Sequence, residues 1–198
     1  MTSKPLPSPA LLRNLIEYNP TTGKLYWKER TPDLFKTTRG KKLRTAEHSC
    51  KQWNQKYVGQ EAFTTTAACH GGALVGTLLC RTMLAHRVAF AVYHGRWPQA
   101  EIDHINGDRR DNRISNLREA SPSDQSRNMP LSRVNKSGRI GVFWITRLSK
   151  WGASIQVNGV SRWLGYHDSF DAAVSAREAA EKEHGFHENH GRPAHVYT

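Results

Sequence analysis

The chain has 198 residues and a formal net charge of +12, and its isoelectric point lies near 10.0. This length allows one domain or two small ones, and such an excess of basic residues is typical of proteins that bind nucleic acid or an anionic membrane surface. No apolar run approaches the roughly 20 residues that span a bilayer, and the N-terminus lacks the apolar segment of a signal peptide, so a membrane protein is excluded and a cytoplasmic one is expected.

Residues 1–72 are expected to form a basic N-terminal region. Apolar residues at helical spacing over 11–16 predict a short helix that ends near Asn19-Pro20, and residues 25–27 predict a strand. The run from Lys36 to Arg44 holds five basic residues and no acidic one. It predicts either a solvated loop or an arm that contacts phosphates, and the pattern favours the two equally.

A central segment over residues 73–130 has a more regular pattern. Small and β-branched residues over 73–80 predict a buried strand, and residues 84–93 have the apolar spacing of a helix. On that helix His86 is expected to be a packed, hydrogen-bonded side chain. A further strand is expected around Ile102.

Residues 131–138 are polar and turn-rich, which predicts a linker, and residues 139–198 form a separate module. Alternation of apolar and polar residues predicts strands over 142–146, 151–157 and 161–166. Asn158-Gly159 between the last two is a strong signal for a hairpin, and Asp168-Ser169 offers an N-cap for an alanine-rich helix over 170–182. The chain is therefore expected to be of the α+β class, with a three-stranded antiparallel sheet and a helix in this module.

The residues that carry chemistry gather in the central segment. Asp103 and His104 are adjacent, and Asn116 follows twelve positions after the histidine. A carboxylate oxygen suits Mg²⁺ or Mn²⁺, an imidazole accepts a proton near neutral pH, and an amide oxygen can orient an imidazole by accepting its N–H. Metal-assisted hydrolysis of a phosphodiester requires these three groups. The alternative is a structural turn loop rich in Asx residues.

A short helix is expected after these residues. Ser121 is a capping serine, Pro122 stands at the first helical position, and Asp124 follows three residues after the cap. Gln125 and Asn128 are three residues apart and share a face of this helix. Either amide oxygen could therefore complete a metal site.

These motifs resemble those of HNH homing endonucleases of the phage and intron-encoded type. The similarity rests on Asp-His-Ile-Asn-Gly at 103–107 and Asn-Arg-Ile-Ser-Asn-Leu at 112–117. The resemblance implies a ββα-metal nuclease core over residues 73–130, which hydrolyses DNA phosphodiester bonds with one divalent ion, Mg²⁺ or Mn²⁺. It implies the following roles: His104 as general base, Asn116 as its orienter, Asp103 as a metal ligand, and Gln125, with Asn128 as the alternative, as the second ligand.

Two arginines flank the orienting asparagine. Arg113 and Arg118 could clamp a phosphate of the DNA, and a solvated surface position is equally compatible with the pattern. Both are therefore candidate DNA-binding residues.

The C-terminal module resembles the plant ethylene-response-factor DNA-binding domain. The similarity rests on Gly141-Val142, Lys150-Trp151 and Trp163-Leu164-Gly165, followed by the alanine-rich helix. In that family one face of a three-stranded sheet lies in the major groove of DNA. The corresponding face here would comprise Phe143, Ile145, Arg147, Ser154, Gln156, Ser161 and Trp163.

The resemblance gives roles to a few residues of this module. Arg147, Lys150 and Arg162 would contact phosphates, and Gln156 would read adenine. Trp144 and Trp151 are instead expected to be core aromatics that pack against the helix.

The sequence thus predicts a DNA endonuclease that acts on double-stranded DNA in the cytoplasm of a bacterial or phage-infected cell, as a monomer or a homodimer. A non-cleaving DNA-binding regulator that keeps the same scaffold is the alternative. RNA binding is less favoured, because the sequence does not show the exposed aromatic sheet that RNA-binding modules use.

Overall fold

The computed structural model describes residues 5–39, 43–121, 124–125, 127–132, 134–188, 190–191 and 193. Over these residues the protein is a mixed α/β structure with four α-helices and several small antiparallel sheets. The chain divides into two compact units, residues 1–104 with 109–119 and residues 105–108 with 120–198. Within the described ranges no helix is long and apolar enough to cross a bilayer.

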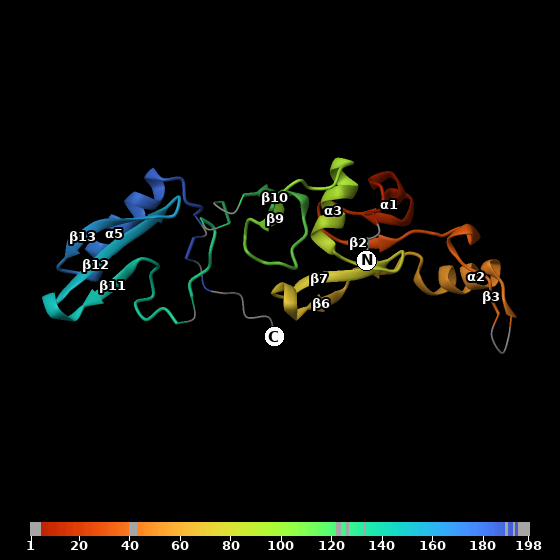
Figure 1. The fold of residues 1–198 in the computed structure, drawn as a ribbon, viewed down its shortest axis with the longest axis horizontal. Coiled ribbons are helices and arrows are strands. Elements are labelled where there is room, and N and C mark those ends of the chain that lie inside the picture. Colours follow the sequence, from red (N-terminus) through yellow and green to blue (C-terminus); the bar gives the residue numbers. More distant parts are fainter. Residues whose placement is uncertain are drawn as a thin grey trace. The chain divides into compact units, whose positions relative to one another are not determined.

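The first unit is built from short strands and three helices. Its elements are α1 (Pro9–Leu15), β1 (Ile16–Tyr18), β2 (Leu25–Trp27), η1 (Pro32–Leu34), β3 (Thr38–Arg39), β4 (Leu43–Arg44), α2 (Ala46–Tyr57), β5 (Glu61–Ala62), β6 (Thr65–Ala67), η2 (Ala68–His70), β7 (Ala73–Leu78), β8 (Arg81–Leu84), α3 (Ala85–His94), β9 (Glu101–His104), η3 (Ile114–Asn116) and β10 (Leu117–Ala120). Strand β2 pairs with β1 and β5, β7 pairs with β6 and β8, and β9 pairs with β10. Helix α1 lies beside α3, as Figure 1 shows.

Helix α3 is the centre of the first unit's core. Val88, Ala89 and Ala91 on this helix are fully buried, and they pack with Leu12 and Leu15 of α1. The helix predicted over 84–93 is therefore confirmed, with each end shifted by one residue.

Helix α1 ends earlier than the apolar spacing predicts. Ile16 has extended backbone angles and pairs with Trp27 across the β1–β2 ladder. The Ile16 side chain is still buried. The apolar spacing therefore predicted its burial correctly, but it assigned the residue to the helix and not to the strand. Strand β2 occupies residues 25–27, as predicted.

Helix α2 was not predicted from the sequence. Thr45 caps it by accepting a hydrogen bond from the His48 amide, and Cys50 is its one buried residue. A helix this polar has no continuous apolar stripe, so periodicity gives no signal for it. The basic run before it contributes strands β3 and β4, while residues 40–42 lie outside the described part of the chain.

The strand predicted over 73–80 stops at Leu78. Leu79 and Cys80 have φ angles of +52° and +59°, so they form the tight turn between β7 and β8. Turns of this handedness match the right-handed twist of the paired strands.

The second unit holds the predicted C-terminal sheet and helix. Strands β11 (Val142–Ile145), β12 (Lys150–Val157) and β13 (Val160–His167) form an antiparallel sheet, with η4 (Thr146–Leu148) between the first two. Asn158 and Gly159 have φ angles of +51° and +80°, which confirms the hairpin. Helix α5 (Phe170–Glu183) packs on one face of this sheet, as Figure 1 shows, and Ser169 caps it by accepting from the Ala172 amide.

A buried ion-pair network ties α5 to the sheet. The Arg177 side chain is 3% exposed, pairs with Glu181 at 2.8 Å and donates to the main-chain carbonyl of Ser154. Arg139 binds the other carboxylate oxygen of Glu181 at 2.6 Å. Gly141 leaves room for this network, because a Cβ there would lie 2.6 Å from the Arg177 guanidinium.

Candidate active site

Strand β9 ends on Asp103 and His104, the two adjacent residues predicted to carry the chemistry. His104 is buried, with 5% of its surface exposed, and Asp103 is partly exposed. Both belong to the first unit. The strand therefore delivers an imidazole into a largely water-free environment, with a carboxylate next to it in the chain.

The imidazole of His104 is held by Asn112. Its Nε2 lies 3.1 Å from Oδ1 of Asn112, a residue that is only 2% exposed. An amide oxygen can only accept, so this contact fits the tautomer that carries its hydrogen on Nε2 and its lone pair on Nδ1. Asn112 was not predicted to contact the histidine, because nothing in the local pattern distinguishes a turn asparagine from one that orients a base.

Asn116 lies at the end of η3 and is also buried. Its amide group donates to the main-chain carbonyl of Asp111 at 2.8 Å. This bond closes the loop that carries Asn112, so Asn116 supports the residue that contacts the histidine. A direct orienting role for Asn116 stays a prediction.

The N-terminal turn braces the same loop. The Tyr18 hydroxyl donates to the main-chain carbonyl of Asn112 at 2.7 Å, and the Ile114 amide donates to the carbonyl of Pro20 at 3.1 Å. Burial is the main cause that raises the pKa of Tyr18, so this phenol stays protonated. A Cβ at Gly23 would lie 2.5 Å from the Arg113 nitrogen, so only glycine permits this approach.

The predicted metal ligand Asp103 forms an ion pair across the β9–β10 sheet. Its Oδ2 accepts from Nη2 of Arg118 at 2.9 Å and from Nε at 3.1 Å. Arg113 forms its own ion pair with Asp111, 2.8 Å from Nε to Oδ1. Both arginines that were predicted to clamp phosphates thus have carboxylate partners within the free protein.

The two candidates for the second metal ligand belong to the second unit. Ser121 and Asp124 form the predicted reciprocal cap, in which each side chain accepts from the other's main-chain N–H, at 3.0 and 3.2 Å. Gln125 is helical, and buried Asn128 donates to the carbonyl of Ile105 at 3.3 Å. Residues 122, 123 and 126 of the predicted helix lie outside the described part of the chain.

The donor atoms match a hard divalent ion in kind. Carboxylate and amide oxygens are the ligands that Mg²⁺ and Mn²⁺ take in proteins. Among the described residues, no group of three or more His, Cys, Asp or Glu side chains could hold a metal ion. The predicted set of Asp103 with Gln125 or Asn128 relies on amide oxygens and stays a prediction.

A second histidine packs against the first. The rings of His86 and His104 meet edge to face, with their centroids 5.0 Å apart. Burial, reinforced by the electrostatic influence of the neighbouring His104, lowers the pKa of His86 from 6.5 to about 3. The packing expected of His86 is confirmed, but its buried Nδ1 has no hydrogen-bond partner among the described residues.

Comparison with known protein families identifies this segment. Residues 83–127 match the HNH endonuclease family. The HNH domain runs from the end of β8 through α3, β9 and β10, so it contains Asp103, His104, Asn112 and Asn116. Gln125 falls within its limits, and Asn128 lies one residue beyond them. No curated protein and no solved structure matches the chain.

Outside the HNH domain, the C-terminal sheet has a face that α5 does not cover. Phe143, Trp163 and Tyr166 are 43%, 47% and 55% exposed, and ring contacts of 6.0 Å and 4.9 Å join Trp163 to the other two. Gly152 lies beneath them, because a Cβ there would come within 2.7 Å of Trp163. The expectation that the sheet lacks an exposed aromatic face was therefore wrong.

The other residues predicted for DNA contact have varied surroundings. Arg147 is exposed, and Lys150 pairs with Asp168 at 3.0 Å. Arg162 stands opposite buried Ile155 in the ladder, which places it on the helix side of the sheet, away from the aromatic face. The Gln156 amide lies 3.4 Å from the Gly159 carbonyl.

The two tryptophans expected in the core differ from each other. Trp151 is partly buried and packs edge to face on Phe170 of α5, as expected. Trp144 touches Trp151 but is 48% exposed, so its assignment to the core was wrong. It lies on strand β11, at the edge of the sheet, where only one neighbouring strand covers it.

Proposed function

We propose that the protein is a metal-dependent endonuclease that hydrolyses phosphodiester bonds of double-stranded DNA, in the manner of homing endonucleases. The observation that carries the proposal is a buried His104, held by Asn112, inside an HNH endonuclease domain. The net charge of +12 supports a polyanionic substrate, since basic side chains release the counterions of DNA when they bind its phosphates.

His104 would act as the general base. With its hydrogen on Nε2 facing Asn112, the imidazole keeps its lone pair on Nδ1, which takes a proton from a water molecule. The oxygen of that water forms a bond to phosphorus in line as the bond to the 3′ oxygen breaks. Asn112 holds the ring in place, while Tyr18 and Asn116 hold the loop that carries Asn112.

Asp103 with Gln125 or Asn128 would hold one Mg²⁺ or Mn²⁺ ion. When bound, such an ion offsets the negative charge that develops on the phosphate and on the departing 3′ oxygen. Arg118 holds Oδ2 of Asp103 in the free protein, so it lowers the affinity of this carboxylate for a cation until DNA draws the guanidinium toward a phosphate.

The C-terminal sheet would hold the DNA. Arg147 and Lys150 suit phosphates, and Gln156 and Trp163 on the open face suit base edges and thymine methyl groups. Arg162 would contact a phosphate only along the edge of the module, because it lies on the helix side. A cytoplasmic location in a bacterial or phage-infected cell is part of the proposal, since the substrate is found there.

A plasmid nicking assay tests the activity. The wild-type protein is expected to nick or linearise supercoiled DNA with Mg²⁺ or Mn²⁺ and not with EDTA. His104→Ala should abolish cleavage and leave DNA binding in a gel-shift assay unchanged, while His48→Ala, an exposed histidine on α2, should change neither. Full cleavage by the His104→Ala variant would contradict the mechanism.

A non-cleaving DNA-binding regulator is the second candidate. The ion pair between Asp103 and Arg118 favours it, because a cation site whose carboxylate is already neutralised binds metal weakly. Sequence-specific binding without nicking, in Mg²⁺ and in Mn²⁺, would select this candidate. Light scattering of the protein with and without DNA would separate a monomer from a homodimer.

A further inference from the structure

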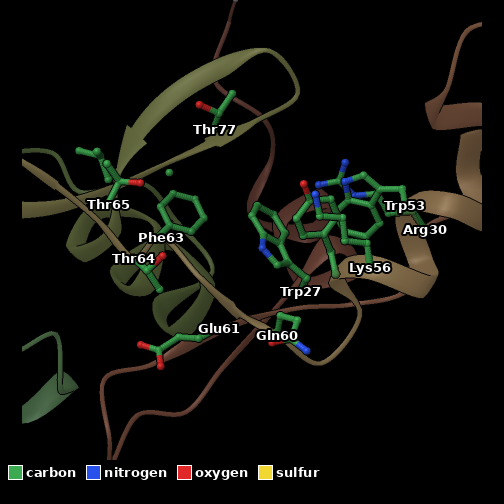
Figure 2. Close-up of a pocket in the computed structure, with 13 residues that line it drawn as sticks. Trp27, Arg30, Trp53, Lys56, Gln60, Glu61, Phe63, Thr64, Thr65 and Thr77 are labelled. Carbon is green, nitrogen blue, oxygen red and sulfur yellow. The ribbon is translucent and has the colours of Figure 1, made fainter.

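A cavity of about 710 Å³ opens in the first unit, outside the residues described for catalysis. Its walls come from β2, helix α2 and the β6–β7 hairpin, and we call it the aromatic pocket. Figure 2 shows Arg30, Trp53 and Lys56 on one side of it, and Phe63, Thr64 and Thr65 on the other, with Trp27 between them.

The wall of the aromatic pocket is a continuous run of rings. Trp27 stacks on Phe63 with ring centroids 5.9 Å apart, and it packs edge to face on Trp53 with centroids 5.7 Å apart. Tyr57 continues the run, 5.1 Å from Trp53. Trp27, Trp53 and Tyr57 are all partly exposed, so part of this apolar surface remains in contact with water.

Two cations stand over these rings. The Arg30 guanidinium lies 3.7 Å from the Trp53 ring centroid and 5.2 Å from that of Trp27, and the Lys56 ammonium lies 5.0 Å from that of Tyr57. Within the described residues, Arg30 has no carboxylate within ion-pair distance, and its buried Nε has no hydrogen-bond partner. Burying a cation without a counter-charge costs free energy, and an anionic ligand beside Arg30 would reduce that cost.

The net charge of the pocket is positive. Among the described residues that line it, Glu61 is the one acidic residue, and Lys24 neutralises that carboxylate at 2.7 Å. Arg30 and Lys56 therefore set the sign of the potential inside the pocket. A ligand that suits it combines a flat, apolar ring with a negative charge.

Backbone strain is stored in the same wall. Phe63 is buried with a φ angle of +59°, a conformation that bulky residues rarely adopt. Gly76 faces it so closely that a Cβ would lie 2.8 Å from the Phe63 ring. Strain of this kind gathers at ligand-binding sites, where the surrounding structure holds a side chain in a required position.

We propose that the aromatic pocket binds one unpaired nucleotide of DNA, with its base against the run of rings and its phosphate on Arg30 and Lys56. Every base has a flat face that stacks on aromatic side chains, and every nucleotide carries the required negative charge. The threonine hydroxyls of the hairpin offer hydrogen bonds to the edge of the base. The choice of DNA as the polymer rests on the proposed function.

Binding in EDTA tests the pocket without cleavage. Fluorescence anisotropy would compare a labelled duplex that has one extrahelical thymidine with the same duplex fully paired. The full-length protein is expected to bind the bulged duplex about tenfold more tightly, which is within the range of a single stacked base. Because no metal is present, this preference can be found even if the protein cleaves nothing.

Two matched pairs of variants locate the effect. Thr65→Trp fills the pocket and should remove the preference, while Thr66→Trp, at the neighbouring exposed position of β6 outside the lining, should keep it. Lys56→Ala should weaken the preference several-fold, while Lys51→Ala on the same helix should not.

Two outcomes would overturn the proposal. Equal affinity of the wild-type protein for the two duplexes excludes an unpaired nucleotide of DNA as the occupant. Saturable binding of dTMP alone, without preference for the bulged duplex, assigns the pocket to a free nucleotide instead. Neither result affects the nicking assay, so failure of the pocket and failure of the nuclease are distinguishable.

Discussion

The hydroxyl of Tyr18 donates a hydrogen bond to the main-chain carbonyl of Asn112, 94 positions further along the chain. Asn112 in turn contacts the imidazole of His104 through its side chain. The N-terminal turn is therefore connected to the proposed base through a single intervening residue, and the HNH segment depends on a part of the chain that lies outside it.

Replacing Tyr18 with phenylalanine tests this connection. Tyr18→Phe leaves a carbonyl without its partner, so the free energy of unfolding should fall by about 1 kcal/mol. Cleavage at saturating DNA should fall about tenfold, since small shifts of a catalytic group are costly. Tyr26→Phe on β2 is the control, because no hydrogen bond of its hydroxyl occurs among the described residues. Equal cleavage rates for the two variants would show that the hydrogen bond from Tyr18 to Asn112 does not position His104.

Asn112 is expected to matter as much as the motif residues that were given catalytic roles. Asn112→Ala removes the group that fixes the His104 ring, and cleavage should fall roughly 10- to 100-fold, as for other residues that orient a ligand or a base. Asn112→Asp is more informative, because its negative charge favours the protonated imidazole. The acidic limb of the pH–rate profile should then move to higher pH, whereas an unchanged profile would contradict contact with the base.

The stability of the first unit should depend on pH through His86. In the folded state burial lowers its pKa from 6.5 to about 3, and His104, Arg87, Arg109 and His70 all oppose its protonation. Below pH 6.5 the unfolded chain takes up a proton that the folded chain excludes, so stability falls as the pH drops towards 3.

Urea unfolding of the wild-type protein and of His86→Gln would measure this contribution. Between pH 7 and pH 5 the wild-type protein should lose about 2 kcal/mol more stability than the variant, at about 1.4 kcal/mol per pH unit below 6.5. Groups that titrate in both proteins cancel in this comparison. Parallel pH profiles would show that His86 takes up its proton in the folded state.

The ion-pair network of the second unit should be sensitive to the loss of one member. Arg177→Ala leaves Glu181 with one cation fewer and the Ser154 carbonyl without its donor, so the second unit should lose about 3–5 kcal/mol of stability. Arg147→Ala, an exposed arginine of the same unit, should stay within about 0.5 kcal/mol of the wild-type protein. A similar small effect for Arg177→Ala would mean that water replaces the network.

Local signals explain which elements were predictable. The Asn158-Gly159 turn, the Ser169 cap and the alternating strands of the second unit are each encoded within a few residues, and the structure has them where they were predicted. Helix α2 was not predicted, because a polar helix that buries a single residue lacks the regular spacing of apolar residues that indicates a helix.

The candidate site shows the same difference between residues that a local sequence pattern predicts and residues that it does not. Asp103 and His104 were found because they are adjacent in a motif. The contact of Asn112 with His104 and the pairing of Arg118 with Asp103 depend on a loop conformation and on the register of β9 with β10, and neither can be read from spacing. Tyr18 left no signal at all, since it acts from a distant part of the chain.

The edge-to-face contact of His86 with His104 also determines where a proton can go. An imidazole with a pKa of about 3 is a far weaker proton acceptor than an ordinary histidine. In the proposed mechanism, a proton that His104 takes from water would therefore not pass on to the ring of His86. It would remain at the reacting face until solvent or the departing 3′ oxygen takes it, so His86 would confine proton exchange to the side on which the DNA would lie.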